Sequence, residues 1–326
     1  MQSTNYISVQ YLRAIAALMV VCFHLHTSGI FAASLWTSWL ASGVDIFFVI
    51  SGFIMVRSTE GKGMGTREFF IKRLIRIVPL YWLLTSFAIA TGGRSLAHNA
   101  ASFLFIPALH PEFGKYWPVL EPGWTLNFEM FFYLVFGLTF TLSPNRQLAF
   151  IAGLFSLLLI SGSVFSLPGS LEFYTNPLLL EFVAGMVVAR LSPRLPTWTC
   201  AAGFVLLIGL HPFGLPRIIG FGVPAVIIFI SFLSADLRLP RISALKIIGD
   251  ASYAIYLVHL FTLAIALEIW ERFFAVNYAF MAFAMFVTII VGIMLHIGFE
   301  RPVTRSLTAW SRKFTNEDKH PLAVAS

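Results

Sequence analysis

Residues 11–30 have the sequence YLRAIAALMVVCFHLHTSGI. This stretch is mostly apolar over about the 20 residues that a helix needs to cross a bilayer. Comparable runs lie near residues 40–57, 77–92, 124–142, 147–165, 173–190, 197–212, 217–234, 246–267 and 279–298. The sequence therefore predicts an all-α polytopic membrane protein with about ten transmembrane helices.

The composition supports this class of protein and excludes others. Of the 326 residues, 58% are hydrophobic and 11% are charged, whereas soluble domains carry roughly 25% charged residues. So few ionised groups cannot cover the surface of a soluble domain. The net charge of +7 does not indicate nucleic-acid binding, because the basic residues lie between hydrophobic runs rather than in one patch. Only two cysteines are present, which excludes a disulfide scaffold.

The distribution of lysine and arginine predicts the orientation in the membrane. With the N-terminus in the cytoplasm, 18 of the 22 basic residues fall inside, and only Arg94, Lys115, Arg217 and Arg272 fall outside. The apolar stretch 100–109 is too short to cross, so we expect a re-entrant or interfacial helix there. Both termini are then cytoplasmic. We expect one domain over residues 1–300 and a cytoplasmic tail over 301–326.

Three ionisable residues on different predicted helices lie at a similar depth. His24 follows Arg13 by 11 residues, a rise of about 16 Å, which places it in the outer half. Asp45 and Glu129 each come about five residues after the outer start of a helix, roughly 7 Å deep. Ionisable groups inside a membrane are costly and often functional. The spacing predicts depth alone, so a shared site also requires the three helices to face one another.

An imidazole beside a carboxylate is a suitable general base, because the carboxylate orients the ring and stabilises its cation. The alternative is that His24 only bonds to a neighbouring helix and supports packing. For three ionisable groups at one level we favour a site, with His24, Glu129 and Asp45 as its catalytic residues. We expect no metal, because the histidines are scattered and no metal-binding motif is present.

The cytoplasmic side of the sequence contains a second group of candidates. Arg73 and Arg76 are three residues apart, so they share a helix face and can bind a polyphosphate. The alternative is that they follow the positive-inside rule and contact lipid headgroups. Tyr256 and His259 also share a face. We expect these two residues, with Trp124 at the outer boundary, to contact substrate.

At these residues the chain resembles the integral-membrane acyltransferase family 3, and within it the exopolysaccharide O-acetyltransferases of the ExoZ type. The resemblance runs nearly from end to end, through the segments YLRAIAALMVVCFHLH, GVDIFFVISGF, RLIRIVPLYW, PGWTLNFEMFFYLVF, GDASYAIYLVH and ERP. Arg13 and His24 match the family's Arg–ten residues–His spacing. Arg73 and Arg76 match its Arg-x-x-Arg element, and Glu129 matches the acidic residue after Trp-Thr-Leu.

The resemblance implies transfer of an acyl group, usually acetyl from acetyl-CoA, to a hydroxyl of a cell-surface or exported carbohydrate in a bacterial inner membrane. The donor would be held by Arg13, Arg73 and Arg76. Many family members carry an additional periplasmic SGNH-type domain, which we do not expect here. The chain would then finish the reaction itself or pass the acyl group to a partner, such as the polysaccharide-synthesis machinery.

Two other functions remain open on the sequence. A transporter or flippase of a lipid-linked glycan also fits ten helices with buried charge, although the lack of internal repeats disfavours it. A non-catalytic assembly subunit of a polysaccharide synthase explains the helices but not the three ionisable groups in the outer half.

Overall fold

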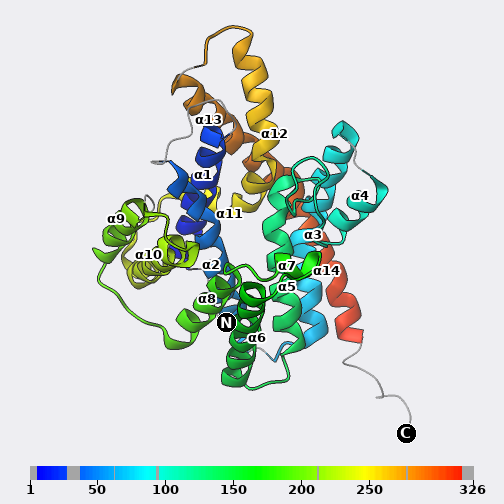
Figure 1. Cartoon of the computed structure of the whole chain (residues 1–326), viewed down its shortest axis with the longest axis vertical. Coiled ribbons are helices and arrows are strands. Elements are labelled where there is room, and N and C mark those ends of the chain that lie inside the picture. Colours follow the sequence, from blue (N-terminus) through cyan, green and yellow to red (C-terminus); the bar gives the residue numbers. More distant parts are fainter. Residues whose placement is uncertain are drawn as a thin grey trace.

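The computed structural model describes residues 6–27, 37–61, 63–92, 95–210, 213–276 and 278–317. Within these ranges the chain is helical, and no β-strand is present (Figure 1). The helices are α1 (Ile7–Thr27), α2 (Gly43–Thr59), α3 (Thr66–Gly92), α4 (Leu96–Phe103), α5 (Trp124–Leu138), α6 (Pro144–Val164), α7 (Ser170–Phe173), α8 (Leu179–Leu191), α9 (Thr199–Leu210), α10 (Val223–Ala235), α11 (Ser243–Asp250), α12 (Ser252–Glu271), α13 (Tyr278–Leu295) and α14 (Arg301–Glu317). Short turns of 3-10 helix form η1 (Ser38–Ser42), η2 (Glu121–Gly123) and η5 (Asp236–Arg238), and π-helical turns form η4 (Ile218–Gly222) and η6 (His296–Glu300).

Seven helical segments of the described chain are long and apolar enough to cross a membrane. They contain α1, α2, α3, α6, α10, α12 and the continuous helix from α13 into α14. The helices predicted near 124–142, 173–190 and 197–212 are present as α5, α8 and α9, but have only 15, 13 and 12 residues. Short helices are tolerated at membrane depth where protein covers the adjoining irregular backbone. The protein is therefore a multi-pass, all-helical membrane protein.

Helix α2 lies at the centre of the bundle, with 72% of its membrane-spanning window buried. It packs closely against α8 because each helix has a glycine at the crossing. A Cβ atom on Gly52 would lie 2.0 Å from the carbonyl oxygen of Phe182, and one on Gly185 would lie 2.1 Å from that of Val49. Small residues at such crossings allow two backbones to approach in a membrane.

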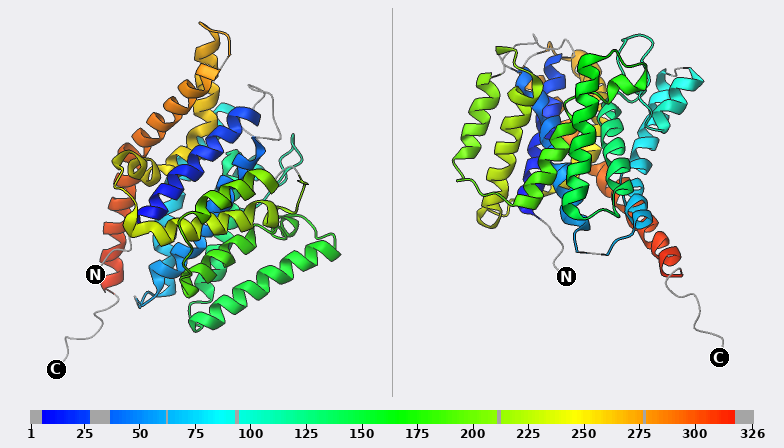
Figure 2. Two further views of the ribbon diagram at one scale, coloured as in Figure 1. Left: turned by 90° about the vertical axis from the view of Figure 1, so that its left-hand side faces the viewer. Right: turned by 60° about the horizontal axis from the view of Figure 1, so that its bottom comes forward.

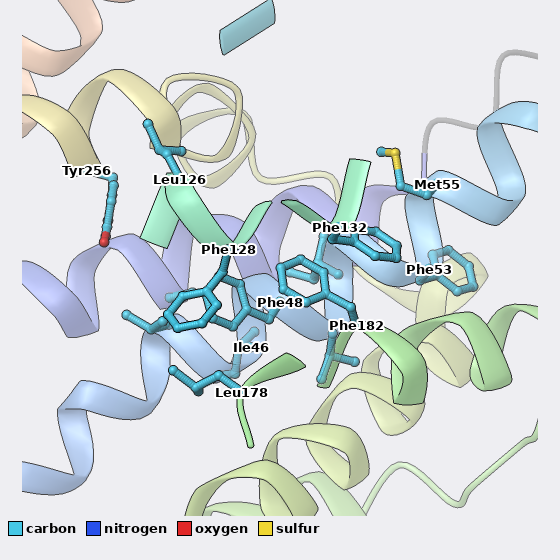
Figure 3. Packing of buried hydrophobic residues seen from close by; sticks show 14 of the residues in the cluster. Ile46, Phe48, Phe53, Met55, Leu126, Phe128, Phe132, Leu178, Phe182 and Tyr256 are labelled. Carbon is cyan, nitrogen blue, oxygen red and sulfur yellow. The ribbon is translucent and has the colours of Figure 1, made fainter. Parts of the chain in front are cut away.

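Aromatic side chains fill the layer between α2, α5 and α8 (Figure 3). Phe182 of α8 stacks on Phe48 of α2 and on Phe132 of α5, with ring centroids 4.5 Å apart in both pairs. All three rings are almost fully buried. This packing holds α5, which carries Glu129, against α2.

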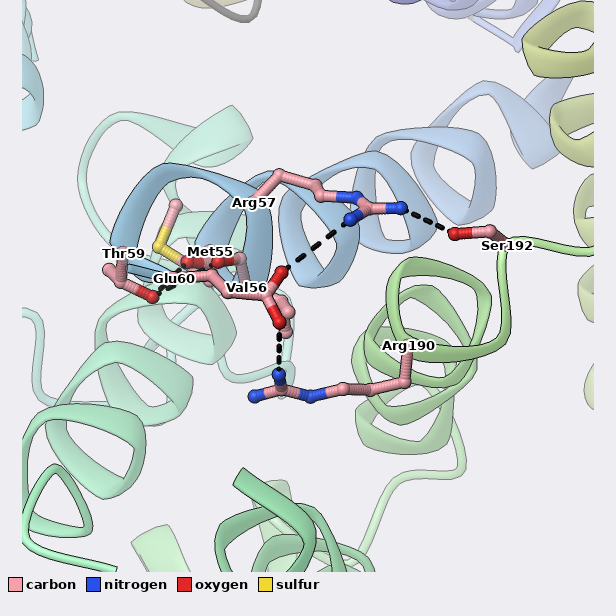
Figure 4. A network of polar contacts seen from close by, with 7 residues as sticks. All are labelled: Met55, Val56, Arg57, Thr59, Glu60, Arg190 and Ser192. Atoms are coloured by element: carbon pink, nitrogen blue, oxygen red, sulfur yellow. Dashed lines mark hydrogen bonds and ion pairs between the residues drawn. The ribbon is translucent and has the colours of Figure 1, made fainter. Parts of the chain in front are cut away.

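Polar contacts join the ends of α2 and α8 (Figure 4). Glu60 accepts hydrogen bonds from Arg190 at 2.8 Å and from Arg57 at 3.5 Å. The Arg57 guanidinium also donates to the Ser192 hydroxyl at 2.5 Å. Because these residues are partly exposed, each pair contributes about 1 kcal/mol or less, and the glycine crossing dominates the packing of the two helices.

The first residues of α1 and the last of α14 lie on the same side of the bundle, opposite α4 (Figure 2). The short apolar stretch 100–109 contains only the end of α4, an eight-residue helix that cannot span a bilayer. Residues 301–317 of the predicted tail form α14, which continues the helix of α13 and packs against α3.

Helix α3 differs from the expected boundaries. The sequence predicts a crossing helix that begins near residue 77. Instead, one 27-residue helix runs from Thr66 and includes Pro79. Membrane helices tolerate an internal proline where neighbouring side chains and local adjustments satisfy the freed backbone groups. The continuous helix places Arg73 and Arg76 on the same rigid element.

Candidate functional site

A cavity of about 140 Å³ lies where α1, α2, α3, α5 and α12 meet. Its polar lining residues come from all five helices: Arg13, Ser51, Arg73, Arg76, Thr125, Glu129, Tyr133, Ser252, Tyr253 and Tyr256. We call this space the reaction cavity. A cavity with several convergent polar groups among apolar walls is typical of a small-molecule binding site.

Glu129 is the carboxylate of the reaction cavity, and two hydroxyl groups donate to the same one of its oxygens. The Ser51 hydroxyl lies 3.1 Å from Oε1 of Glu129, and the Tyr133 hydroxyl makes a short hydrogen bond to the same atom. Tyr133 follows Glu129 by four residues on α5, so the two side chains share a helix face. The two hydroxyl groups thus fix the position of one oxygen of this carboxylate.

Three arginines line the reaction cavity: Arg13, Arg73 and Arg76. The three-residue spacing of Arg73 and Arg76 predicts that these two share a helix face. Arg13 donates to the Ser252 hydroxyl at 3.1 Å. Arg73 donates to Ser58 at 3.0 Å, and its guanidinium lies over the Phe69 ring. Arg76 lies 3.5 Å from Oε1 of Glu300. The cavity can therefore hold a polyanion beside the Glu129 carboxylate.

His24 is paired with a second histidine, His259 of α12. Nε2 of His259 lies 3.2 Å from Nδ1 of His24. The Nδ1 atoms of His24 and His259 lie 2.9 and 2.5 Å from the carbonyl oxygens of Val20 and Tyr256, respectively. Because a carbonyl oxygen only accepts, these contacts assign the proton of each neutral ring to Nδ1. The basic nitrogen of neutral His24 is therefore Nε2.

Tyr256 connects the histidine pair to the reaction cavity. Its carbonyl accepts the His259 hydrogen bond, while its side chain lines the cavity. The Tyr256 hydroxyl lies 2.9 Å from the Thr125 hydroxyl and donates to the Pro122 carbonyl at 3.1 Å. Tyr256 and His259 are in contact on one face of α12, and their role in binding substrate stays a prediction. No pattern in the sequence indicates the contact between His259 and His24.

Asp45 lies in a different ionic cluster. Both of its oxygens accept hydrogen bonds from Arg217, at 3.1 and 2.6 Å, and its side chain is fully buried. Buried Glu181 of α8 lies in the same cluster, since it interacts electrostatically with Asp45 and Arg217. Asp45 precedes Ser51 by six residues, which is about 120° around the helix. The two carboxylates that the sequence places at one depth therefore point to different neighbours.

Trp124 lies at the first residue of α5, and its ring packs edge-on against Phe128. It is not among the described residues that line the reaction cavity. The preceding turn, η2, carries Glu121. Burial raises the pKa of the Glu121 carboxyl, and the Lys115 ammonium acts in the opposite direction.

Neither Ser51 nor Tyr133 is among the site residues that the sequence predicts. Gly52 packs against α8, while the hydroxyl of the preceding Ser51 donates to Glu129. For Tyr133, the four-residue spacing from Glu129 was a usable signal. Across the described ranges, no group of three or more His, Cys, Asp or Glu side chains lies close enough to hold a metal ion.

Known proteins that are similar to this chain include acyltransferases. A family model described as an acyltransferase domain matches residues 6–297. The exopolysaccharide production protein ExoZ of Rhizobium meliloti is 37% identical over 286 residues, which cover 81% of this chain and 90% of that protein. Acyltransferase MdmB of Streptomyces mycarofaciens is 28% identical, with 92% of each chain covered. The peptidoglycan O-acetyltransferase OatA of Listeria monocytogenes is 24% identical over 58% of this chain and 35% of that protein. No solved structure matches the chain.

Proposed function

The chain belongs to the acyltransferase family whose model covers residues 6–297, and on this premise we propose that it transfers an acetyl group from cytosolic acetyl-CoA to a hydroxyl of an exported or lipid-linked polysaccharide. The observation that carries the proposal is the reaction cavity, which three arginines line together with the carboxylate of Glu129. A polyanionic acyl donor requires such cations. The similarity to an exopolysaccharide production protein supports a carbohydrate acceptor.

The donor enters from the side of the bundle where α1 begins. Arg13, Arg73 and Arg76 bind this polyanionic donor, because guanidinium groups make strong charge-assisted hydrogen bonds to anions. Arg13 and His24 are 11 residues apart on α1, which places them within about 20° of the same face and about 16 Å apart along the axis. The thin pantetheine arm can follow this face and bring the thioester toward His24.

His24 acts as the general base in this mechanism. Its Nε2 takes the proton of the acceptor hydroxyl while that oxygen attacks the thioester carbonyl. The carbon–sulfur bond then breaks, an ester forms, and the CoA thiolate takes the proton from the imidazolium. An acetyl group carried by His24 itself is the alternative route. Trapping of a radiolabelled acetyl-histidine would establish that route instead.

The other candidate residues take supporting roles. Glu129, which lines the reaction cavity, supplies the negative charge that stabilises the imidazolium of His24. His259 orients the His24 ring through the contact between the two imidazoles. Tyr256 and Trp124 bind the acceptor at the outer end of α5. We assign Asp45 to an ion pair with Arg217 that fixes the position of α2, rather than to the reacting atoms.

With this donor and acceptor, the protein would act in the cytoplasmic membrane of a bacterium, next to the machinery that builds the polysaccharide. The experiment uses the purified protein with acetyl-CoA, and measures CoA release with and without a lipid-linked oligosaccharide. We expect release that depends on the acceptor. We expect His24→Ala to lower the rate by about 10²- to 10⁴-fold, the usual contribution of a general base.

Two control variants change a histidine and a glutamate that do not line the reaction cavity. His26→Ala lies two residues further along α1, and Glu268→Gln lies on the exposed part of α12. Both controls should retain activity, whereas Glu129→Gln should lose it. Full activity of His24→Ala or Glu129→Gln would remove that residue from the mechanism. Absence of any interaction with CoA would favour the transporter or flippase function.

A further inference from the structure

A second cavity, of about 480 Å³, opens beside the reaction cavity. It lies between the first turns of α1, the middle of α3, helix α11 and the junction of α13 with α14. Its lining residues are Gln10, Arg13, Arg76, Lys246, Ile247, Asp250, His296 and Arg301. We call this space the basic vestibule.

The basic vestibule and the reaction cavity share two lining residues, Arg13 and Arg76. These guanidinium groups therefore lie between the two spaces, one reaching from α1 and the other from α3. Arg73, by contrast, lines the reaction cavity and bonds to Ser58. A ligand that fills both spaces must pass beside Arg13 and Arg76.

The vestibule has an excess of positive charge. Four of its lining residues are arginine or lysine, and Asp250 is its one acidic lining residue among those described. Lys246 pairs with Asp250 at 2.6 Å, and their side chains are 52% and 34% exposed. Exposed pairs of this kind are weak and exchange partners at little cost. A strong anion can therefore recruit Lys246 without an uncompensated buried charge.

The junction of α13 and α14 carries Arg301, the fourth basic residue that lines the vestibule. Residues 296–300 form a π-helical turn, an arrangement that is frequent at functional sites. Within it, buried Glu300 accepts a hydrogen bond from His296 at 2.8 Å and also faces Arg76. The Glu300 carboxylate thus forms an ion pair with Arg76 at 3.5 Å, while Arg301, the next residue, is exposed at the vestibule.

We propose that the basic vestibule binds the phosphorylated nucleotide head of the acyl donor, with Lys246 and Arg301 as phosphate contacts, while the pantetheine arm passes between Arg13 and Arg76 into the reaction cavity. This inference rests on the proposed function. It adds a head-group site built from α11 and the α13–α14 junction. The arginines then contact different parts of the donor. Arg301 contacts the nucleotide head, whereas Arg73 contacts the arm or the acyl group.

Separate contacts for the head and the arm predict that variants of the vestibule change the KM for one donor and not for another. Acetyl-pantetheine carries the same thioester as acetyl-CoA but lacks the nucleotide. Lys246→Ala and Arg301→Ala should each raise the KM for acetyl-CoA roughly tenfold, as expected from the loss of one charge-assisted phosphate contact. Neither variant should change kcat, and neither should change the KM for acetyl-pantetheine.

The controls are Lys72→Ala and Arg146→Ala. Lys72 is a half-exposed lysine of α3 paired with Glu68, and Arg146 is exposed in the first turn of α6; neither lines the vestibule or the reaction cavity. Both controls should leave the kinetics of both donors unchanged. An equal rise in KM for the two donors in Lys246→Ala and Arg301→Ala would overturn the head-group site, because the variants would then act on the cavity or the fold. Unchanged KM values for acetyl-CoA would overturn it as well.

A binding measurement separates this proposal from the proposed function. Radiolabelled CoA and pantetheine are titrated onto the wild type and the two variants, without an acceptor. Binding of CoA that weakens in both variants, with pantetheine unaffected, supports the vestibule even when no turnover occurs. Binding of CoA that neither variant weakens overturns the vestibule alone. Absence of CoA binding to the wild type overturns both proposals.

Discussion

The Glu129 carboxylate shows how single residues define the site. One of its oxygens accepts hydrogen bonds from both Ser51 and Tyr133, and the surrounding cavity carries three arginines. A hydrogen bond to an ionised group contributes about 1.5–3 kcal/mol. The two hydroxyl groups therefore keep this anion in one orientation among several cations that compete for it.

Removal of the tyrosine hydroxyl should weaken catalysis without unfolding the protein. Tyr133→Phe deletes one donor but keeps the ring, so we expect kcat/KM to fall roughly 10- to 100-fold, corresponding to about 1.5–3 kcal/mol. The measurement is the rate of CoA release with a saturating acceptor. Tyr174→Phe is the control, because Tyr174 packs on Phe131 outside the reaction cavity. Wild-type activity of Tyr133→Phe would show that Glu129 needs no such donor.

The partner of the His24 ring is a second imidazole rather than a carboxylate. A carboxylate is the usual partner of a catalytic imidazole, and the sequence offers Asp45 and Glu129 at a matching depth. The structure instead pairs His24 with His259. Because both rings carry their proton on Nδ1, the pair orients His24 without placing an additional negative charge beside it.

At the scale of helices, the crossing of α2 and α8 positions the site. Its two glycines bring the backbones into contact, so Asp45 and Ser51 of α2 are held at defined rotations toward their different partners. A sliding or rotation of α2 would move both side chains together. The crossing therefore links the Asp45–Arg217 ion pair to the geometry of Glu129.

A methyl group at this crossing should destabilise the bundle. In Gly52→Ala the new Cβ atom would lie 2.0 Å from the Phe182 carbonyl oxygen, so the helices must separate. We expect a loss of about 1–3 kcal/mol, as for other overpacked interiors, seen as a lower Tm in detergent and lower activity. Gly153→Ala on α6 is the control, because its Cβ has no neighbour within 4 Å. An equal Tm for the two variants would contradict the close packing.

At the scale of the whole molecule, the orientation in the membrane decides which cavity meets the cytoplasm. The distribution of basic residues predicts cytoplasmic termini, and the basic vestibule lies on the side where α1 begins. Donor and acceptor can then approach from opposite sides of the bilayer. This arrangement would allow a cytosolic donor to modify an exported glycan.

Cysteines introduced at the two ends of α6 can test the orientation of the protein in the membrane. Ser143 and Ser166 are both exposed and flank α6. In a background with Cys22→Ser and Cys200→Ser, we expect an impermeant thiol reagent to label Ser166→Cys in intact cells. Ser143→Cys should be labelled only after the cells are opened. The reverse pattern would invert the topology and place the basic vestibule outside the cytoplasm.

The all-helical membrane class, the approximate positions of the helices and the residues most suited to chemistry all follow from the amino-acid sequence. This is so because hydropathy and helical rise are properties of one segment at a time. Arg13 and His24 share a face of α1 for the same reason. The proximity of Arg73 to Arg76 in the reaction cavity follows from their spacing as well.

The rotation of the helices against one another is visible in the folded protein alone. That rotation turns Ser51 toward Glu129 and Asp45 toward Arg217, although depth alone grouped the two carboxylates. It also joins His24 to His259 and lets two cavities share Arg13 and Arg76. The physical reason is that rotation depends on side-chain packing between helices distant in sequence, such as the glycine contacts of α2 with α8, and no pattern within one helix specifies it.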